Sequence, residues 1–163
     1  MHELKRSFAP VADARARVLV LGSLPGEQSL AQARYYAHPQ NQFWRLIGAV
    51  IGRDLVPLPY EERLVALRGA GVALWDTIGA ARRRGSLDGA IRDVEANALA
   101  RLADTLPALR AVGFNGGKSA AMGIPQLAGR AGLALIALPS SSPAYTLPFA
   151  AKVEQWRALA PFL

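Results

Sequence analysis

Four short runs of mostly apolar residues recur along the chain, and each ends at a glycine, a proline or a polar residue. Several of their members are β-branched, and each run is shorter than a typical helix. Runs of this kind indicate strands buried on both faces, as in a parallel sheet. We therefore expect four strands, at residues 18–21, 72–75, 111–114 and 133–138.

The segments between these runs carry apolar residues at helical spacing. In one of them, Leu99, Leu102 and Leu106 share a face of the helix that we expect over residues 94–106. Further helices are expected over residues 43–51, 60–67 and 149–159.

Strands that alternate with helices predict a parallel sheet with helices on both faces. The sequence therefore predicts an α/β fold: a single three-layer α/β/α domain over residues 1–163, with a central, mainly parallel four-stranded sheet and an irregular segment at residues 1–15. Right-handed crossovers place the loops after all four strands at one edge of the sheet. Ligands bind at that edge in open α/β sheets.

The segment after the first expected strand holds residues suited to a planar ligand. A turn, Gly22-Ser-Leu-Pro-Gly26, comes first, and residues 35–44 then include two tyrosines, a histidine and an asparagine. Aromatic rings stack on planar ligands, and an amide offers both a donor and an acceptor. Recognition of a base extruded from DNA requires such a pocket.

The composition narrows the chemistry. The chain has no cysteine and two histidines, so disulfides, thiolate nucleophiles and cysteine-ligated metal centres are excluded. We expect neither a metal nor a cofactor. The N-terminal residues are polar, and no apolar run approaches the ~20 residues of a membrane span. We expect a cytoplasmic protein without membrane contact.

The formal net charge of +7 has two explanations. A basic surface attracts the phosphates of nucleic acids, but a high arginine content can also follow from genome composition. The densest basic cluster, residues 82–84, is either a nucleic-acid contact or a solvated loop.

Four motifs occur in the order and spacing of a known family. They are Gly22-Ser-Leu-Pro-Gly26, the run Tyr36-Ala-His-Pro-Gln-Asn-Gln-Phe-Trp44, Phe114-Asn-Gly116 and Leu138-Pro-Ser-Ser-Ser-Pro143. Together they resemble the uracil-DNA glycosylase superfamily, in its mismatch-specific and thymine-DNA glycosylase-like part. Most members carry Asn or Asp where this chain has Leu24, and that departure is most similar to the hypoxanthine-DNA glycosylase branch.

The resemblance implies a monofunctional hydrolase of base excision repair. Such an enzyme flips a deaminated base (hypoxanthine, uracil or xanthine) out of double-stranded DNA and hydrolyses its N-glycosidic bond with water. Lys118 is the lysine expected near a motif, and its place at a helix start suggests phosphate contact rather than Schiff-base chemistry. A monomer is expected.

The resemblance also implies a catalytic residue. Asn41 matches the catalytic Asn of the hypoxanthine branch, where it would hold the attacking water, and Ser23 is the alternative water-holder. Asn is also among the best helix N-cap residues, so Asn41 has a structural alternative.

The same matches assign the binding residues. Tyr36 would stack on the flipped base, unless its ring is ordinary packing, and Tyr145 would wedge into the vacated position. The remaining base-binding residues would be Asn115, Gly22 and Leu24, and DNA would contact Ser140, Ser141, Ser142, Pro143 and Lys118.

Two residues and two other functions stay open. His38 is either a general acid or a structural hydrogen-bonding residue, and Asp76 is either a general base or a turn or cap residue. Leu24 and Leu138, at positions often polar in the family, leave room for a catalytically inactive nucleic-acid- or nucleotide-binding module. A phosphate-loop kinase is disfavoured, because the position five residues before Gly117 is Val112 rather than glycine.

Overall fold

The computed structural model describes residues 3–163, and its centre is a four-stranded parallel sheet. Its strands run in the spatial order β3-β2-β6-β7, and every neighbouring pair is parallel. The expected strands are confirmed, each to within one residue at either end. The strands are β2 (Val18–Gly22), β3 (Val72–Asp76), β6 (Ala111–Asn115) and β7 (Ala134–Leu138).

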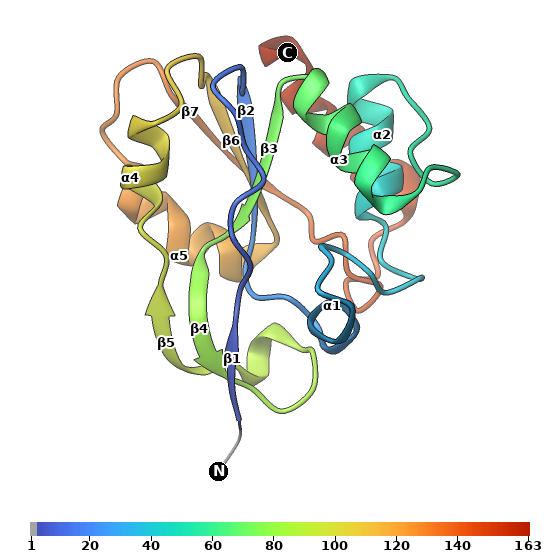
Figure 1. The fold of residues 1–163 in the computed structure, drawn as a ribbon, viewed down its shortest axis with the longest axis vertical. Coiled ribbons are helices and arrows are strands. Elements are labelled where there is room, and N and C mark those ends of the chain that lie inside the picture. Colours follow the sequence, from blue (N-terminus) through green and yellow to red (C-terminus); the bar gives the residue numbers. More distant parts are fainter. Residues whose placement is uncertain (1–2) are drawn as a thin grey trace.

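Helices cover both faces of this sheet, as Figure 1 shows. Alternate residues of β2 point to opposite sides: Val18 and Val20 belong to one buried cluster, and Leu19 and Leu21 to the other. The three-layer α/β/α fold is therefore confirmed. The first face packs against α2 (Phe43–Ile51), α3 (Tyr60–Gly69), α6 (Phe149–Trp156) and the 3-10 turn Arg157–Phe162, and the second against α4 (Leu99–Asp104) and α5 (Gly117–Leu127).

A second, antiparallel sheet was not expected from the sequence. It has the order β1-β4-β5, with β1 (Leu4–Arg6), β4 (Ile78–Arg82) and β5 (Arg92–Ala96). The irregular segment predicted for residues 1–15 therefore contains a strand; residues 1 and 2 of that segment lie outside the described part. The predicted helix over residues 94–106 was wrong in its first part, because residues 94–96 pair with β4 and the helix begins at Leu99.

The error at β5 has a physical cause. All five of its residues are exposed, and their sequence, Arg-Asp-Val-Glu-Ala, lacks the apolar alternation of a half-buried strand. Backbone pairing with β4, rather than burial, makes this segment a strand. The connection between β4 and β5 includes the 3-10 turn Asp88–Ala90 and runs toward the carboxyl edge of the large sheet.

Candidate active site

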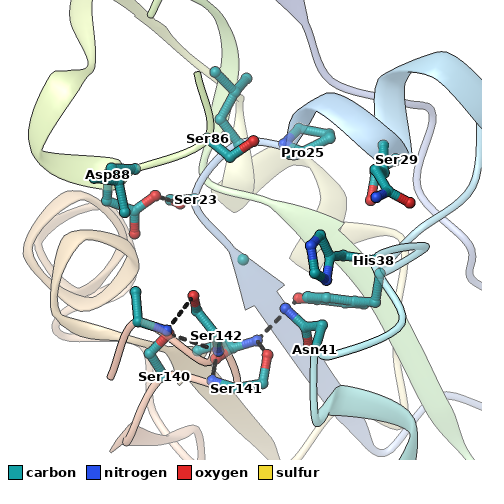
Figure 2. Close-up of a pocket in the computed structure, with 18 of the residues that line it drawn as sticks. Ser23, Pro25, Ser29, His38, Asn41, Ser86, Asp88, Ser140, Ser141 and Ser142 are labelled. Atoms are coloured by element: carbon teal, nitrogen blue, oxygen red, sulfur yellow. Dashed lines mark hydrogen bonds between the residues drawn. The ribbon is translucent and has the colours of Figure 1, made fainter. Parts of the chain in front are cut away.

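A cavity of about 280 Å³ lies at the carboxyl edge of the parallel sheet. Its walls come from the segments that follow β2, β3, β6 and β7, so the four sequence motifs meet there as expected. Two further parts of the wall come from the short helix α1 (Glu27–Gln32) and from the β4–β5 connection. Figure 2 shows His38 and Asn41 on one side of this pocket, with Ser23 and Asp88 opposite them.

Gly22 ends β2 at the floor of the pocket. An added Cβ there would lie 2.6 Å from Asp76 Oδ1 and 2.9 Å from the Tyr36 hydroxyl oxygen. Both distances are shorter than real Cβ contacts allow, so any side chain at this position would displace one of the two groups. The absence of a side chain lets a carboxylate and a phenol approach the same point from two sides.

Tyr36 is held in an unusual conformation at the pocket. Its φ of 53° lies in the left-handed region, which is uncommon for a residue other than glycine. One face of its ring stacks on Phe43, with centroids 3.9 Å apart and planes at 12°. Trp44 Nε1 donates to the Tyr36 carbonyl at 3.2 Å and so helps fix the backbone. Burial raises the pKa of the Tyr36 hydroxyl, which therefore stays protonated.

Asn41 lines the pocket with its amide held in one orientation. Its Oδ1 accepts the backbone N–H of Phe43 at 2.9 Å, at the start of α2. Because a backbone N–H requires an acceptor, this bond assigns the oxygen to that side of the amide and leaves Nδ2 on the other. Within residues 3–163, no hydrogen-bond partner is found for Nδ2. The N-cap alternative considered for Asn41 was wrong, because the N-cap residue of α2 is Gln42 and the Asn41 oxygen instead closes a turn just before the helix. This turn leaves Nδ2 free for a ligand.

His38 is exposed and lies beside Asn41 (Figure 2). Its Nδ1 accepts the backbone N–H of Gln40 at 3.1 Å. The neutral imidazole therefore carries its proton on Nε2. The structural hydrogen-bonding role expected for His38 is present, and the ring also lines the pocket.

Asn115 ends β6 and is nearly fully buried. Its Nδ2 donates to the Tyr36 hydroxyl at 3.2 Å and to Ser141 Oγ at 2.9 Å, while its Oδ1 accepts the Ser141 backbone N–H at 2.8 Å. All the polar atoms of the amide are engaged within the protein. Asn115 thus fixes the Tyr36 hydroxyl and the loop after β7 relative to each other. The next residue, Gly116, has a φ of +97°, which favours glycine at this turn.

The serine loop, residues 140–144, forms another wall. Ser140 Oγ accepts the N–H of Ser142 at 3.1 Å, and Ser142 Oγ accepts the N–H of Ala144 at 3.2 Å. These side-chain turns fix the loop and leave both hydroxyl protons available for donation. Ser141 differs, since it is buried against Asn115.

The remaining residues expected to contact DNA lie at the margin. Pro143 lines the pocket and is exposed. Tyr145, 44% exposed, follows the serine loop, and Lys118 is the half-buried second residue of α5. Neither Tyr145 nor Lys118 lines the pocket itself.

Lys152 of α6 lies behind the serine loop, contrary to the expectation that Lys118 alone would be near a motif. It is fully buried, and its Nζ donates to Gln42 Oε1 at 2.9 Å and to the Ser142 carbonyl at 3.2 Å. Burial lowers its pKa. This contact could not be predicted, because Lys152 lies in an amphipathic helix outside the four motifs and lysine is mostly exposed.

The arginine cluster at residues 82–84 is not simply a solvated loop. Arg83 is buried at 1% exposure, donates to the Gly85 carbonyl at 2.7 Å, and also donates to the Leu24 and Pro25 carbonyls. These hydrogen bonds to the Leu24 and Pro25 carbonyls stabilise the turn of residues 22–26. Leu24 itself packs into a small cluster with Ile78, Ala81 and Ile91, from β4 and the β4–β5 connection.

Two carboxylates, Asp76 and Asp88, line the pocket. From the sequence, the role of Asp76 was left open and Asp88 was not identified as a site residue. Ser23 donates its hydroxyl to Asp88 Oδ1 at 2.6 Å, across the pocket wall. Asp76 lies at the floor and is 3% exposed; its Oδ2 accepts the Ser7 hydroxyl at 2.7 Å. The position of Asp76 directly after a buried strand was the available signal, whereas Asp88 depends on the unpredicted second sheet.

Burial dominates the electrostatics of Asp76. It raises the pKa of this carboxyl to about 7, with a further increase from Asp88 and opposing effects from the Ser7 hydrogen bond and Arg83. A carboxyl with a pKa near neutrality in a cleft marks a candidate functional group. Among residues 3–163, no group of three or more potential metal-ligating side chains is present.

Comparisons with known proteins identify the family. The sequence model of the uracil DNA glycosylase superfamily matches residues 9–160. The chain belongs to the uracil-DNA glycosylase superfamily. The resemblance inferred from the four motifs is confirmed, and with it the expectation that the protein is a DNA glycosylase.

The chain is similar to two curated proteins that are named hypoxanthine DNA glycosylase. The one from Methanosarcina barkeri is 46% identical over 115 residues, which cover 71% of this chain and 73% of the relative. The one from Methanosarcina acetivorans is 38% identical over 156 residues, 96% and 98% of the two chains.

A solved structure has the same fold. It is the solution NMR structure of a candidate uracil DNA glycosylase from Methanosarcina acetivorans, 38% identical to this chain. The two superpose with a TM-score of 0.87 over 97% of each chain. Across the described residues, no helix is both long and apolar enough to cross a membrane, and the expected cytoplasmic location stays a prediction.

Proposed function

We propose that this DNA glycosylase removes hypoxanthine, and also uracil and xanthine, from double-stranded DNA, and that it prefers hypoxanthine to uracil opposite adenine. The observation that carries the proposal is Asn41, whose amide is fixed by Phe43 and lines a pocket bounded by Tyr36 and the serine loop. Leu24, buried in an apolar cluster, offers no polar group at the position where most of the superfamily carries Asn or Asp. The names of the two curated relatives support the same substrate.

The damaged nucleotide is flipped into the pocket before chemistry. Hypoxanthine pairs poorly in a duplex, so its extrusion costs less than that of a well-paired base. The Tyr36 ring, backed on one face by Phe43, offers its other face to the base. The serine loop holds the backbone through the free hydroxyl protons of Ser140 and Ser142.

Bond cleavage leaves positive charge on the sugar and negative charge on the departing base. The Asn41 amide holds a water against the anomeric carbon, and Ser23 is the second group able to hold it. Because Asn41 is fixed before the substrate arrives, it needs no reorganisation during the reaction. The Leu138 side chain supplies no electrostatic help, which suits a base that departs easily.

The reaction is proposed to be hydrolysis without a covalent enzyme intermediate. Within residues 3–163 no lysine side chain lines the pocket: Lys118 lies outside it and Lys152 lies behind the serine loop. A Schiff base with the sugar would require a lysine at the anomeric carbon. Incubation with substrate and borohydride is therefore expected to trap no protein–DNA adduct.

One experiment tests the whole proposal. Matched duplexes that contain hypoxanthine, uracil, xanthine or only normal bases are incubated with the enzyme, and abasic sites are then cleaved with alkali. We expect cleavage at hypoxanthine, faster than at uracil opposite adenine, and none in the normal duplex. Robust uracil excision with none of hypoxanthine would contradict the substrate assignment but not the family.

The proposed partner is duplex DNA bound by a monomer. The net charge of +7 favours phosphate contact, so excision under subsaturating conditions is expected to fall as salt rises, through counterion release. Rates at several salt concentrations and light scattering of the free enzyme check the two parts.

A further inference from the structure

The free group of the Asn41 amide can only donate a hydrogen bond. Its Oδ1 is occupied by the backbone N–H of Phe43, so Nδ2 is the part left for a ligand. An amide N–H donates and does not take up a proton. An attacking water loses a proton as its oxygen bonds to carbon. Asn41 can therefore orient that water, but a second group has to accept its proton.

Most polar side chains of the pocket are already engaged in hydrogen bonds with the protein. His38 Nδ1 accepts a backbone N–H, so its other nitrogen carries the proton. Asn115 Oδ1 accepts a backbone N–H of the serine loop, and the oxygens of Ser140 and Ser142 accept two more. Each of these residues faces a ligand mainly as a hydrogen-bond donor.

Ser23 and Asp88 are arranged differently. Ser23 donates its hydroxyl proton to Asp88 Oδ1 at 2.6 Å, a length typical of a hydroxyl bonded to a carboxylate. Because this proton points to Asp88, the lone pairs of the Ser23 oxygen are left to accept from a water. Both residues line the pocket, and Figure 2 shows them on the side opposite Asn41.

The backbone holds both members of this pair in place. The Ser23 carbonyl accepts the N–H of Ile78 in β4 at 3.0 Å. Asp88 begins the 3-10 turn of the β4–β5 connection. Three residues before it, the Gly85 carbonyl accepts Arg83 Nε at 2.7 Å. The pair is thus oriented before the substrate arrives, which lowers the cost of reorganisation during the reaction.

We propose that Ser23 is a catalytic residue that accepts a proton from the attacking water and passes its own proton to Asp88. The inference rests on the glycosylase function proposed above and adds the destination of the proton. As the water oxygen bonds to the anomeric carbon, one water O–H bond breaks and that proton moves to Ser23 Oγ. The Ser23 proton moves to Asp88 Oδ1, and the electron pair of the N-glycosidic bond leaves with the base. Asp88 is only half-buried, so solvent can take the proton afterwards.

Asp88 acts through Ser23, so the first test separates its positioning of Ser23 from its uptake of a proton. Asp88→Asn keeps an oxygen that can accept the Ser23 hydroxyl, but an amide does not take up the proton. Single-turnover excision of hypoxanthine should fall by about 10²-fold in Asp88→Asn and in Ser23→Ala, the lower range for loss of a general base. The double variant should be no slower than the slower single variant, because residues that act as a unit are not additive. Wild-type excision in Asp88→Asn, or losses that multiply in the double variant, overturns the proposal.

Added formate distinguishes proton uptake from a structural role. Asp88→Ala leaves room beside Ser23 for a small carboxylate, so formate should raise its excision rate by about tenfold or more. Formate should not help Ser23→Ala, which lacks the connecting hydroxyl. Asp104→Ala is the matched control: Asp104 pairs with Arg130 outside the pocket, so this variant should keep the wild-type rate and not respond to formate. Sodium chloride at equal ionic strength controls for salt, and a folded Asp88→Ala protein that formate does not rescue overturns the proposal.

A measurement on the wild-type enzyme covers the case in which the variants do not fold. Excision rates are measured in mixtures of H₂O and D₂O. The relay moves two protons, so the rate should follow a curve as the deuterium fraction rises, whereas direct transfer from water to a single carboxylate such as Asp76 gives a straight line. A straight line, or no isotope effect, overturns the relay while the glycosylase function stands. A wild-type enzyme that excises no deaminated base instead contradicts the proposed function, and the inference falls with it.

Discussion

The side-chain oxygen of Asn41 accepts the backbone N–H of Phe43 at 2.9 Å, so one amide both fixes the turn that precedes helix α2 and faces the pocket. A hydrogen bond of this kind contributes about 1 kcal/mol to stability. A substitution at Asn41 therefore has two separable effects, one on folding and one on catalysis.

Replacement of Asn41 by Ala is expected to lower the single-turnover rate of hypoxanthine excision by about 10²–10³-fold, the usual cost of removing one preorganised polar group. Duplex binding should stay close to wild type, because Asn41 would hold water rather than phosphate. Near wild-type excision would move the catalytic role to Ser23.

Asn41→Asp separates the two roles of this residue. The carboxylate still accepts the Phe43 N–H, so the thermal unfolding midpoint should stay near that of the wild type. The variant lacks the Nδ2 donor, and excision should still fall. Recovery of full activity in Asn41→Asp would show that only the oxygen bonded to the Phe43 N–H matters.

Tyr36→Ala should slow the excision of every accepted base by a similar factor. Stacking on a ring contributes about 1–3 kcal/mol per base and discriminates little between bases. Tyr36→Phe should be mild, because the ring and its contact with Phe43 are kept. Rates for hypoxanthine and uracil in both variants check this, and equal damage in the two variants would assign the role to the hydroxyl.

The raised pKa of Asp76 predicts a pH-dependent stability difference. In the unfolded chain an Asp has a pKa near 4, whereas burial and Asp88 raise it to about 7 in the fold, against the effects of Ser7 and Arg83. The folded state therefore binds this proton more tightly, and its stability falls as pH rises from about 4 to 7.

Asp76→Asn removes this titration, so its stability advantage over the wild type should grow over that pH range, to roughly 4 kcal/mol at most. Urea unfolding at several pH values measures the difference. Asp104→Asn serves as the exposed control and should follow the wild type. A constant difference between Asp76→Asn and the wild type would mean that Asp76 is ionised throughout.

Lys152→Met should loosen the serine loop. The substitution removes both Nζ hydrogen bonds and leaves the Ser142 carbonyl without its donor, which we expect to weaken duplex binding about tenfold. The salt dependence of binding should not change, because the buried lysine does not reach phosphate. Lys118→Met, by contrast, should reduce the salt slope by about one.

Excision should be insensitive to chelators. The residues that the structure describes contain no cluster of metal-ligating side chains, and the proposed chemistry needs only water and an amide. Rates with and without EDTA should agree. Loss of activity that a divalent ion restores would require a different mechanism.

The sequence was sufficient to predict the strands and helices whose positions are determined by burial. The strands around Val20 and Val112 are apolar because both faces of the sheet are covered, and that pattern is visible without coordinates. Asn41 and Tyr36 could be assigned to the pocket because they share a motif in the segment that follows the first of these strands.

The features that could not be predicted from the sequence depend on strand pairing and on contacts between residues far apart in the chain. Strand β5 is exposed and polar, so it carries no apolar period, and without it the loop that holds Asp88 could not be placed. Arg83 and Lys152 are of residue types that are mostly exposed, yet both are buried against backbone carbonyls. Only tertiary structure provides those acceptors.

Ser7 and Asp76 are 69 positions apart in the chain but share a hydrogen bond under the pocket. The chemistry of the pocket floor thus depends on a segment that precedes every recognisable motif. A protein shortened to begin at residue 8 would keep all four motifs but lose the Ser7 hydroxyl. Asp76 Oδ2 would then be left without its hydrogen-bond donor. Relatives matched only through their motifs would need to be compared at this segment before the electrostatics of their pocket floors are equated.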